Sequence, residues 1–158
     1  MFFLFLEVTS VPFHKYYSKS KDDHFYTTNK HEVDASDDYT HLSVACHIYP
    51  TQVPGSLPFY RYFNGHNSFY TLYGTEIGAT TPGDVGKFGY RSEGVAGYCY
   101  PQQEAGSIPL YRYYKHERTY DHYYTTDTSD IGTTILGQMG RDGYKFEGVA
   151  CYVPSKER

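Results

Sequence analysis

Three imperfect copies of one unit occupy most of the chain, and this self-similarity limits the folds open to it. Each copy begins with an aromatic segment: VPFHKYY, LPFYRYF or IPLYRYY. Each continues with DHFYTT, NSFYTL or DHYYTT and ends with VACHIYP, VAGYCYP or VACYV. A period of roughly 45–50 residues indicates one supersecondary unit that packs against its siblings. We therefore expect one pseudo-threefold domain over residues 1–158, with repeats at approximately 11–56, 57–107 and 108–154.

The pattern within each copy predicts an all-β fold. Short segments rich in Tyr, Phe, Val and Thr alternate with turn residues, which is typical of strands. Each copy contains three such segments, as in PLYRYY, HFYTT and EGVAGYCY. A fourth could lie in the glycine-rich connectors EIGATTPGDVGKFGY and DIGTTILGQMGRDGY, which shrink to EVDASDDY in the first copy. A β-trefoil is the expected architecture, and a three-sheet β-prism or propeller-like arrangement is the alternative.

Composition argues against two classes of partner. The net charge is -4 with only 14 Lys and Arg residues, so no basic surface for nucleic acid is expected. Mean hydropathy is -0.62 and no apolar run reaches the roughly 20 residues of a membrane span, so membrane insertion is not expected. The opening MFFLFLE has no positively charged region and no small-residue cleavage site. We interpret it as a β-strand rather than a signal peptide.

The three cysteines are expected to be buried free thiols. Their odd number excludes a full disulfide framework. Cys46, Cys99 and Cys151 alternate along their segments so that each shares a strand face with valine or isoleucine. No CxxC or CxH pattern is present, and no metal or other cofactor is expected.

The joint occurrence of P-x-Y-R-Y-Y, D-H-F-Y-T-T and E-G-V-A-G-Y-C-Y-P resembles a repeat family of unassigned function, found as C-terminal appendages of secreted bacterial and fungal proteins. A small feather-star (crinoid) lectin is built of similar repeats. The resemblance covers Val11 to Tyr152. It implies binding of galactose-terminated glycans of the N-acetyllactosamine type, and glycoproteins as partners. It also implies an extracellular protein, or one that is stored and released.

Two sets of side chains could carry sugar binding. Sugars are held by polar groups on their hydroxyls and by an aromatic ring on their C–H face. Asp-His precedes an aromatic pair in the first and third copies, whereas Asn67-Ser68 replaces it in the second. This polar pair could contact a ligand or only form a turn. The tyrosines at 26, 70 and 124 are the same in all copies, which is equally consistent with a core role.

An arginine and a glutamate also change together between copies. Arg61 occurs with Glu93 and Arg112 with Glu147, and both members are replaced in the first copy. The joint change predicts contact, either as a structural ion pair or with the carboxylate also bound to sugar hydroxyls. The candidate glycan-binding residues are Arg112, Asp121, His122, Tyr124 and Glu147 in the third copy and Asp23, His24 and Tyr26 in the first.

We expect a non-catalytic lectin. A glycosidase needs two carboxylates that flank one bond, whereas each repeat supplies a single equivalent Glu, and no GxSxG or HExxH motif occurs. Repetition within the chain, or formation of a homo-oligomer, would strengthen weak sites through multivalency. The alternative is a protein-binding scaffold or inhibitor module that uses its tyrosine-rich surface.

Overall fold

A computed structural model describes residues 8–155. These residues form β1 (Val11–Ser18), β2 (Asp23–Thr27), β3 (Tyr39–Ile48), β4 (Leu57–Phe63), β5 (Ser68–Thr71), β6 (Arg91–Cys99), β7 (Ser107–His116), β8 (Tyr120–Thr125) and β9 (Tyr144–Pro154), with single 3-10 turns η1 (Gly74–Glu76), η2 (Lys87–Gly89) and η3 (Arg141–Gly143). The strand predicted over residues 1–7 lies outside the described part. Within that part, no helix is long and apolar enough to cross a membrane.

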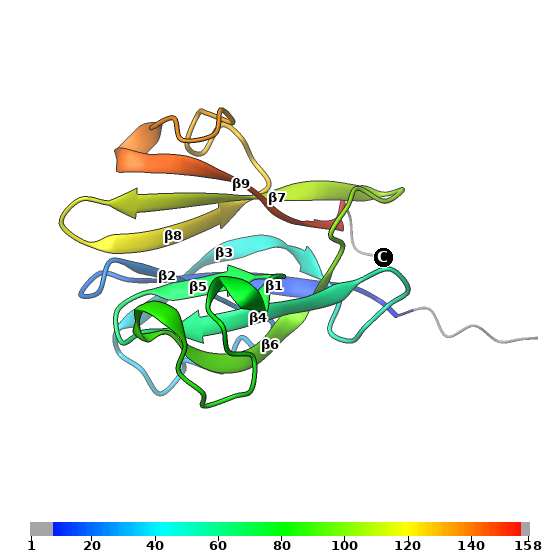
Figure 1. Ribbon diagram of the computed structural model, residues 1–158, viewed down its shortest axis with the longest axis horizontal. Coiled ribbons are helices and arrows are strands. Elements are labelled where there is room, and N and C mark those ends of the chain that lie inside the picture. Colours follow the sequence, from blue (N-terminus) through cyan, green and yellow to red (C-terminus); the bar gives the residue numbers. More distant parts are fainter. Residues whose placement is uncertain (1–7, 156–158) are drawn as a thin grey trace, which may run out of the picture.

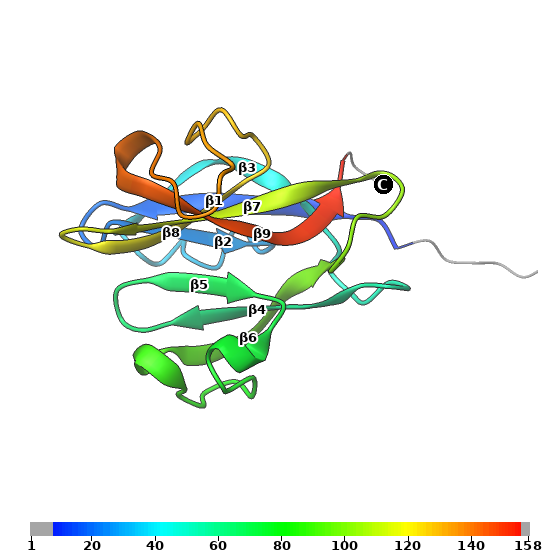
Figure 2. The same ribbon diagram turned by 45° about the horizontal axis from the view of Figure 1, so that its top comes forward.

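Each repeat forms its own antiparallel sheet of three strands. The strand orders are β2-β1-β3 in repeat 1, β5-β4-β6 in repeat 2 and β8-β7-β9 in repeat 3, so the first strand of each repeat is central. Figures 1 and 2 show the three sheets grouped around one centre. The predicted all-β class and pseudo-threefold arrangement are confirmed. The described strands form no closed barrel, and their arrangement is compatible with a trefoil or prism-like organisation.

The glycine-rich connectors supply the extra pairing anticipated in repeats 2 and 3. Val85 forms an isolated antiparallel bridge with Arg91, and Met139 forms one with Lys145. These bridges lie at the outer edges of β6 and β9. The shorter connector of repeat 1 contains only local backbone turns among its described residues, as at Glu32, whose N–H donates to the carbonyl of Asn29. The connectors therefore distinguish repeat 1 from its siblings.

The tyrosines that recur in the second strand of each repeat, Tyr26, Tyr70 and Tyr124, meet at the centre of the molecule. The hydroxyl of Tyr70 accepts from the backbone N–H of Tyr26 at 2.7 Å and donates to the carbonyl of Tyr26 at 2.6 Å. Tyr26 and Tyr124 repeat this arrangement, which closes a ring of three. All three side chains are buried, and burial raises the pKa of each hydroxyl well above its usual value. A glycan cannot reach them, so the assignment of Tyr26 and Tyr124 as glycan ligands is wrong.

The prediction of three free thiols is correct only for Cys46, which is buried and unpaired. Cys99 and Cys151 form a disulfide that joins repeats 2 and 3. Alternation along a strand gives the face of a cysteine but not its neighbour in the next repeat. At the corresponding junction between repeats 1 and 2, Gly97 leaves room for Ile48, because an added Cβ would lie 2.8 Å from that side chain. The disulfide thus occupies a site of contact between the repeats.

Candidate functional site

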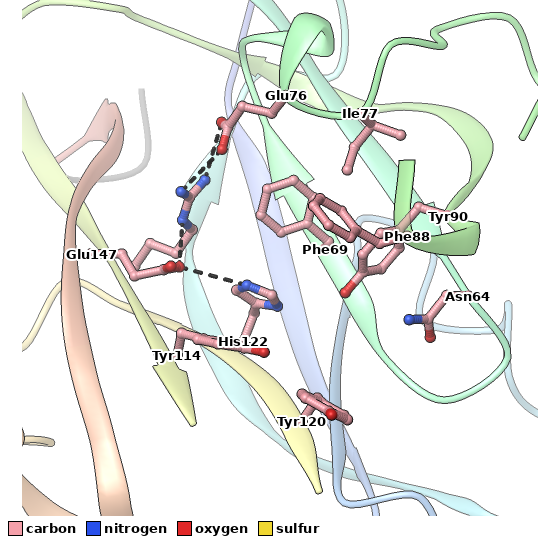
Figure 3. A pocket seen from close by; sticks show the side chains of 11 residues that line it. Asn64, Phe69, Glu76, Ile77, Phe88, Tyr90, Tyr114, Tyr120, His122 and Glu147 are labelled. Atoms are coloured by element: carbon pink, nitrogen blue, oxygen red, sulfur yellow. Dashed lines mark hydrogen bonds and ion pairs between the residues drawn. The ribbon is translucent and has the colours of Figure 1, made fainter. Parts of the chain in front are cut away.

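A cleft of about 530 Å³ lies between repeats 2 and 3. Repeat 2 contributes residues from β5, η1 and η2, and repeat 3 contributes residues from β7, β8 and β9 (Figure 3). Aromatic, acidic, basic and amide side chains converge here. The lining residues are Asn64, Phe69, Glu76, Ile77, Phe88, Tyr90, Arg112, Tyr114, Tyr120, His122 and Glu147.

Arg112 organises one wall of the cleft. Its Nε donates to Glu147 Oε1 at 3.0 Å, which confirms the predicted contact between these two residues. The equivalent pair of Arg61 and Glu93 is also formed, at 2.9 Å. Both terminal nitrogens of Arg112 donate to the carboxylate of Glu76, at 3.3 and 3.2 Å. The guanidinium is therefore fixed by a carboxylate from each repeat, an arrangement that its planar fork favours.

A β-bulge directs Glu147 toward this arginine. In the pairing of β7 with β9, Arg112 lies opposite Gly148 and Tyr113 lies opposite Phe146, so Glu147 is the extra residue. Gly148 has φ +114°, a conformation that favours glycine over residues with a side chain. Bulges of this kind re-aim a side chain next to a functional site.

His122 presents a hydrogen-bond acceptor to the cleft. Its Nδ1 lies 2.7 Å from Asn67 Oδ1, which also accepts from the hydroxyl of Tyr90 at 2.7 Å. The amide nitrogen of Asn67 donates to the backbone carbonyl of Tyr120, so Oδ1 is the acceptor and Nδ1 carries the proton. Burial lowers the pKa of His122 well below its ordinary value, which keeps the ring neutral.

The unprotonated Nε2 of His122 then lies 3.5 Å from Glu147 Oε1. Burial raises the pKa of Glu147, although the charge of Arg112 opposes this change. Two acceptors therefore stand side by side at the cleft (Figure 3). A ligand that carries hydroxyl donors would satisfy both of them.

Phe88 and Tyr120 expose aromatic surface at the cleft. Phe88 is 80% exposed and Tyr120 is 52% exposed. Phe88 also has φ +58°, a backbone conformation that is unfavourable for a bulky residue. The equivalent residue of repeat 3 is Asp142, which has the same φ and tolerates it better. Neither packing nor backbone preference accounts for a phenylalanine at this position.

One protein family matches the chain twice, over residues 2–82 and 79–154, and its description is "Domain of unknown function (DUF5648)". The chain belongs to the DUF5648 family. The two matches meet inside repeat 2 rather than at a boundary between structural repeats. No curated protein and no solved structure matches the chain.

The structure brings together three of the predicted residues, Arg112, His122 and Glu147, but not Asp121. The carboxylate of Asp121 is fully buried and accepts from the backbone N–H and Nδ1 of His24, at 2.9 and 2.6 Å, and from the hydroxyl of Tyr144. It connects repeat 3 to repeat 1. Its assignment as a direct glycan ligand is wrong, because its oxygens are already satisfied in the interior.

The first predicted unit does not form a comparable site. Asp23 is fully buried and accepts from the backbone N–H and hydroxyl of Ser68 and from the hydroxyl of Tyr39, so it too was wrongly assigned as a ligand. The side chain of His24 is only 13% exposed, and its ring packs between Tyr17 and Tyr123. In repeat 1 the Asp-His pair therefore joins neighbouring repeats, whereas in repeat 3 the histidine, His122, lines the cleft.

Sequence reasoning missed several residues of the cleft, chiefly Glu76, Phe88, Tyr120 and Asn64. The available signal was a difference between copies: Phe88 stands in GKFG where the third copy has GRDG. Cleft carboxylates do not form a metal site by themselves. In the range 8–155, no three His, Cys, Asp or Glu side chains are grouped so that they could hold a metal ion.

Proposed function

We propose that the chain is a non-catalytic lectin that binds a galactose-terminated glycan of the N-acetyllactosamine type in the cleft between repeats 2 and 3. The observation that carries this proposal is the exposed ring of Phe88, held with a positive φ at a cleft that also contains polar groups. An exposed aromatic face beside hydrogen-bonding groups suits the mixed surface of a sugar.

The polar groups of the cleft include both acceptors and a donor for sugar hydroxyls. Glu147 and the Nε2 of His122 are acceptors. Asn64 Oδ1 accepts from the backbone N–H groups of His66 and Asn67, which leaves the amide nitrogen of Asn64 as a donor directed to the cleft (Figure 3). A sugar hydroxyl can both donate and accept, so adjacent hydroxyls can satisfy such a set.

The carboxylates favour binding over hydrolysis. Glu76 and Glu147 both bind the guanidinium of Arg112, so they share one wall of the cleft. A glycosidase places its two carboxylates on either side of the scissile bond. The arrangement here therefore supports a role in holding hydroxyls.

The proposed setting is extracellular, with cell-surface glycoproteins as partners. The disulfide between Cys99 and Cys151 supports this setting, because such bonds persist mainly in oxidising compartments. A shallow sugar site binds weakly, and presentation of several sites on one particle would raise its avidity.

Phe88→Asp tests the proposal, because it introduces the residue that repeat 3 carries at the same backbone position. We expect affinity for N-acetyllactosamine to fall at least about tenfold, which is about 1.4 kcal/mol, as measured by calorimetric titration. The free energy of unfolding should stay equal or rise slightly, because aspartate tolerates the positive φ better.

Val85→Ser is the matched control, because Val85 is 54% exposed on the same connector but does not line the cleft. Its affinity should equal that of the wild type. Unchanged binding by Phe88→Asp would show that the ligand does not use this cleft.

A protein-binding scaffold is the second candidate. The connector of repeat 3 exposes Ile135 by 65% and Leu136 by 74%, which are apolar side chains outside the cleft. Such side chains can anchor a protein partner. A wild-type chain that binds no glycan on an array, at concentrations that detect weak lectins, would contradict the lectin proposal and favour this alternative.

A further inference from the structure

The outer edges of β6 and β9 are covered by backbone hydrogen bonds from their connectors. At β6, Ser92 accepts from the N–H of Gly83 and donates to the carbonyl of Asp84, both at 2.8 Å. The same two bonds recur at β9, between Phe146 and the connector residues Gly137 and Gln138, at 2.9 and 3.1 Å. Covering an edge in this way prevents another strand from pairing with it.

The outer edge of β3 has no such cover in the described structure. His41 is the residue equivalent to Ser92 and Phe146, but the short connector of repeat 1 forms only local turns among its described backbone groups. Residues 40–44 of β3 are all exposed. A sheet with the order β2-β1-β3 therefore ends in an accessible edge strand at this position.

This edge lacks the charged residues and the proline that usually protect an exposed strand, and its register with β1 shifts at Leu42 and at Ala45. Residues 40–46 read THLSVAC, without a formal charge at neutral pH and without proline. Leu42 is 50% exposed where the other repeats carry Glu93 and Glu147, and Val44 is 45% exposed. Among residues 8–155, an apolar side chain therefore stands at the position of a carboxylate on the third-strand edge that its connector leaves open.

We propose that the β3 edge is a self-association surface, at which a second copy of the chain pairs its own β3 antiparallel, centred near Leu42. A twofold axis makes one strand self-complementary in this arrangement, and the two sheets become one sheet of six strands. The uncharged centre avoids repulsion between like charges. The same pairing brings the acidic Asp37, just before β3, opposite His47 near the end of the partner strand.

The dimer would leave both glycan clefts accessible, because β3 contributes no residue to the cleft between repeats 2 and 3. Pairing over few residues buries a small area, so the association should be weak and dependent on concentration. A dimer with two clefts would bind a glycan-bearing surface more strongly than a single chain. The proposal itself concerns only self-association and does not depend on the ligand.

Sedimentation equilibrium of the full chain, without any glycan, tests this proposal. Over about 5 to 500 µM, the average mass of the wild type should rise from that of a monomer toward that of a dimer. Leu42→Glu introduces the residue of the other two repeats and should remain monomeric throughout. Val149→Glu places the same charge on β9, where Val149 is 41% exposed, and should leave association unchanged.

Thr40→Lys provides a second variant, because the equivalent positions carry Arg91 and Lys145 and so tolerate a positive charge. Its unfolding curve should match that of the wild type, while self-association falls at least about tenfold. A wild type that stays monomeric over the whole range would overturn the proposal. A dimer that persists in both folded edge variants would also overturn it, because another surface would then be responsible.

Discussion

The junction between repeats 2 and 3 is open, whereas the equivalent junction between repeats 3 and 1 is closed by an ion pair. Lys115 Nζ lies 2.5 Å from Asp22 Oδ2, and Asp22 also accepts from the hydroxyls of Tyr17 and Thr119. At the open junction, the positions of Lys115 and Asp22 are occupied by Asn64 and Tyr120 respectively, and both line the cleft. Of these two junctions, the one without the closing pair contains the cleft.

The two junctions also differ in the polar groups on their walls. Arg112 and Glu147 at the open junction correspond to Lys15 and Leu42 at the closed one. Lys15 donates to the hydroxyl of Tyr123 at 3.0 Å, and burial lowers its pKa. The closed junction therefore has no carboxylate at the position of Glu147.

Removing the carboxylate that joins repeats 3 and 1 should have the largest effect. Asp121→Ala leaves the backbone N–H and ring of His24 and the hydroxyl of Tyr144 without their acceptor. We expect a loss of about 3–5 kcal/mol in the free energy of unfolding, measured in urea, because a buried interacting pair loses one member. Asn67→Ala, the equivalent change at the open junction, removes hydrogen bonds with Tyr90 and His122 and a long one to the carboxylate of Asp23, and should cost about 1–3 kcal/mol.

Equal losses in the two variants would show that the charge of Asp121 adds nothing to the junction. A fully stable Asp121→Ala protein with weakened glycan binding would instead restore this residue as a ligand contact.

Comparison of the three copies was sufficient to predict the strands, the repeat arrangement and the Arg112–Glu147 contact. These features lie within one repeat, so alignment of the copies keeps the interacting residues together. The interpretation of Asp-His as a ligand-binding pair failed for Asp23, His24 and Asp121, for the opposite reason. Asp23 binds Ser68 and Asn67 binds His122, so each partner belongs to the next copy. The replacement of Asp-His by Asn67-Ser68 in the second copy suggested a lost ligand site. Asn67 and Ser68 nevertheless still join repeats.

The remaining cleft residues depend on which repeats meet and on the path of the connectors. Phe88 and Tyr120 come from different copies, and periodicity along one strand does not place them together. The disulfide of Cys99 with Cys151 was missed for the same reason. Differences between copies did mark Phe88 and Tyr120, because the equivalent residues in other copies are Asp142 and Asp22 respectively.

Low pH should destabilise the fold through His122 at the open junction. Burial lowers the pKa of this ring well below 6.5, so the folded protein keeps it neutral while the unfolded chain takes up a proton as pH falls below about 6.5. Its contribution to stability is thus complete above pH 6.5 and is lost at lower pH. We expect it to lower the free energy of unfolding by about 2 kcal/mol between pH 7 and pH 5.

His122→Ser, which introduces the residue of repeat 2, isolates this effect in urea unfolding at both pH values. Asp23 changes stability in the opposite direction, because burial raises its pKa to about 6 and the folded state then binds its proton more tightly as pH falls. Asp23 is present in both proteins, so its effect cancels. The free energies of unfolding of the wild type and His122→Ser should differ more at pH 7 than at pH 5, because only the wild type loses the His122 contribution in acid. Parallel curves would contradict a neutral His122 in the fold.

Transfer of the Lys115–Asp22 ion pair to the open junction should change stability least among these variants. Asn64→Lys combined with Tyr120→Asp introduces at the cleft the residues that close the other junction. Glycan affinity, measured by calorimetric titration, should fall at least about tenfold, or about 1.4 kcal/mol. Stability should change by less than about 1 kcal/mol, because partly exposed ion pairs contribute little. The two substitutions also remove the exposed Tyr120 ring and the donor amide of Asn64 from the cleft. If the double variant binds glycan as the wild type does, these two positions neither contact the ligand nor decide which junction is open.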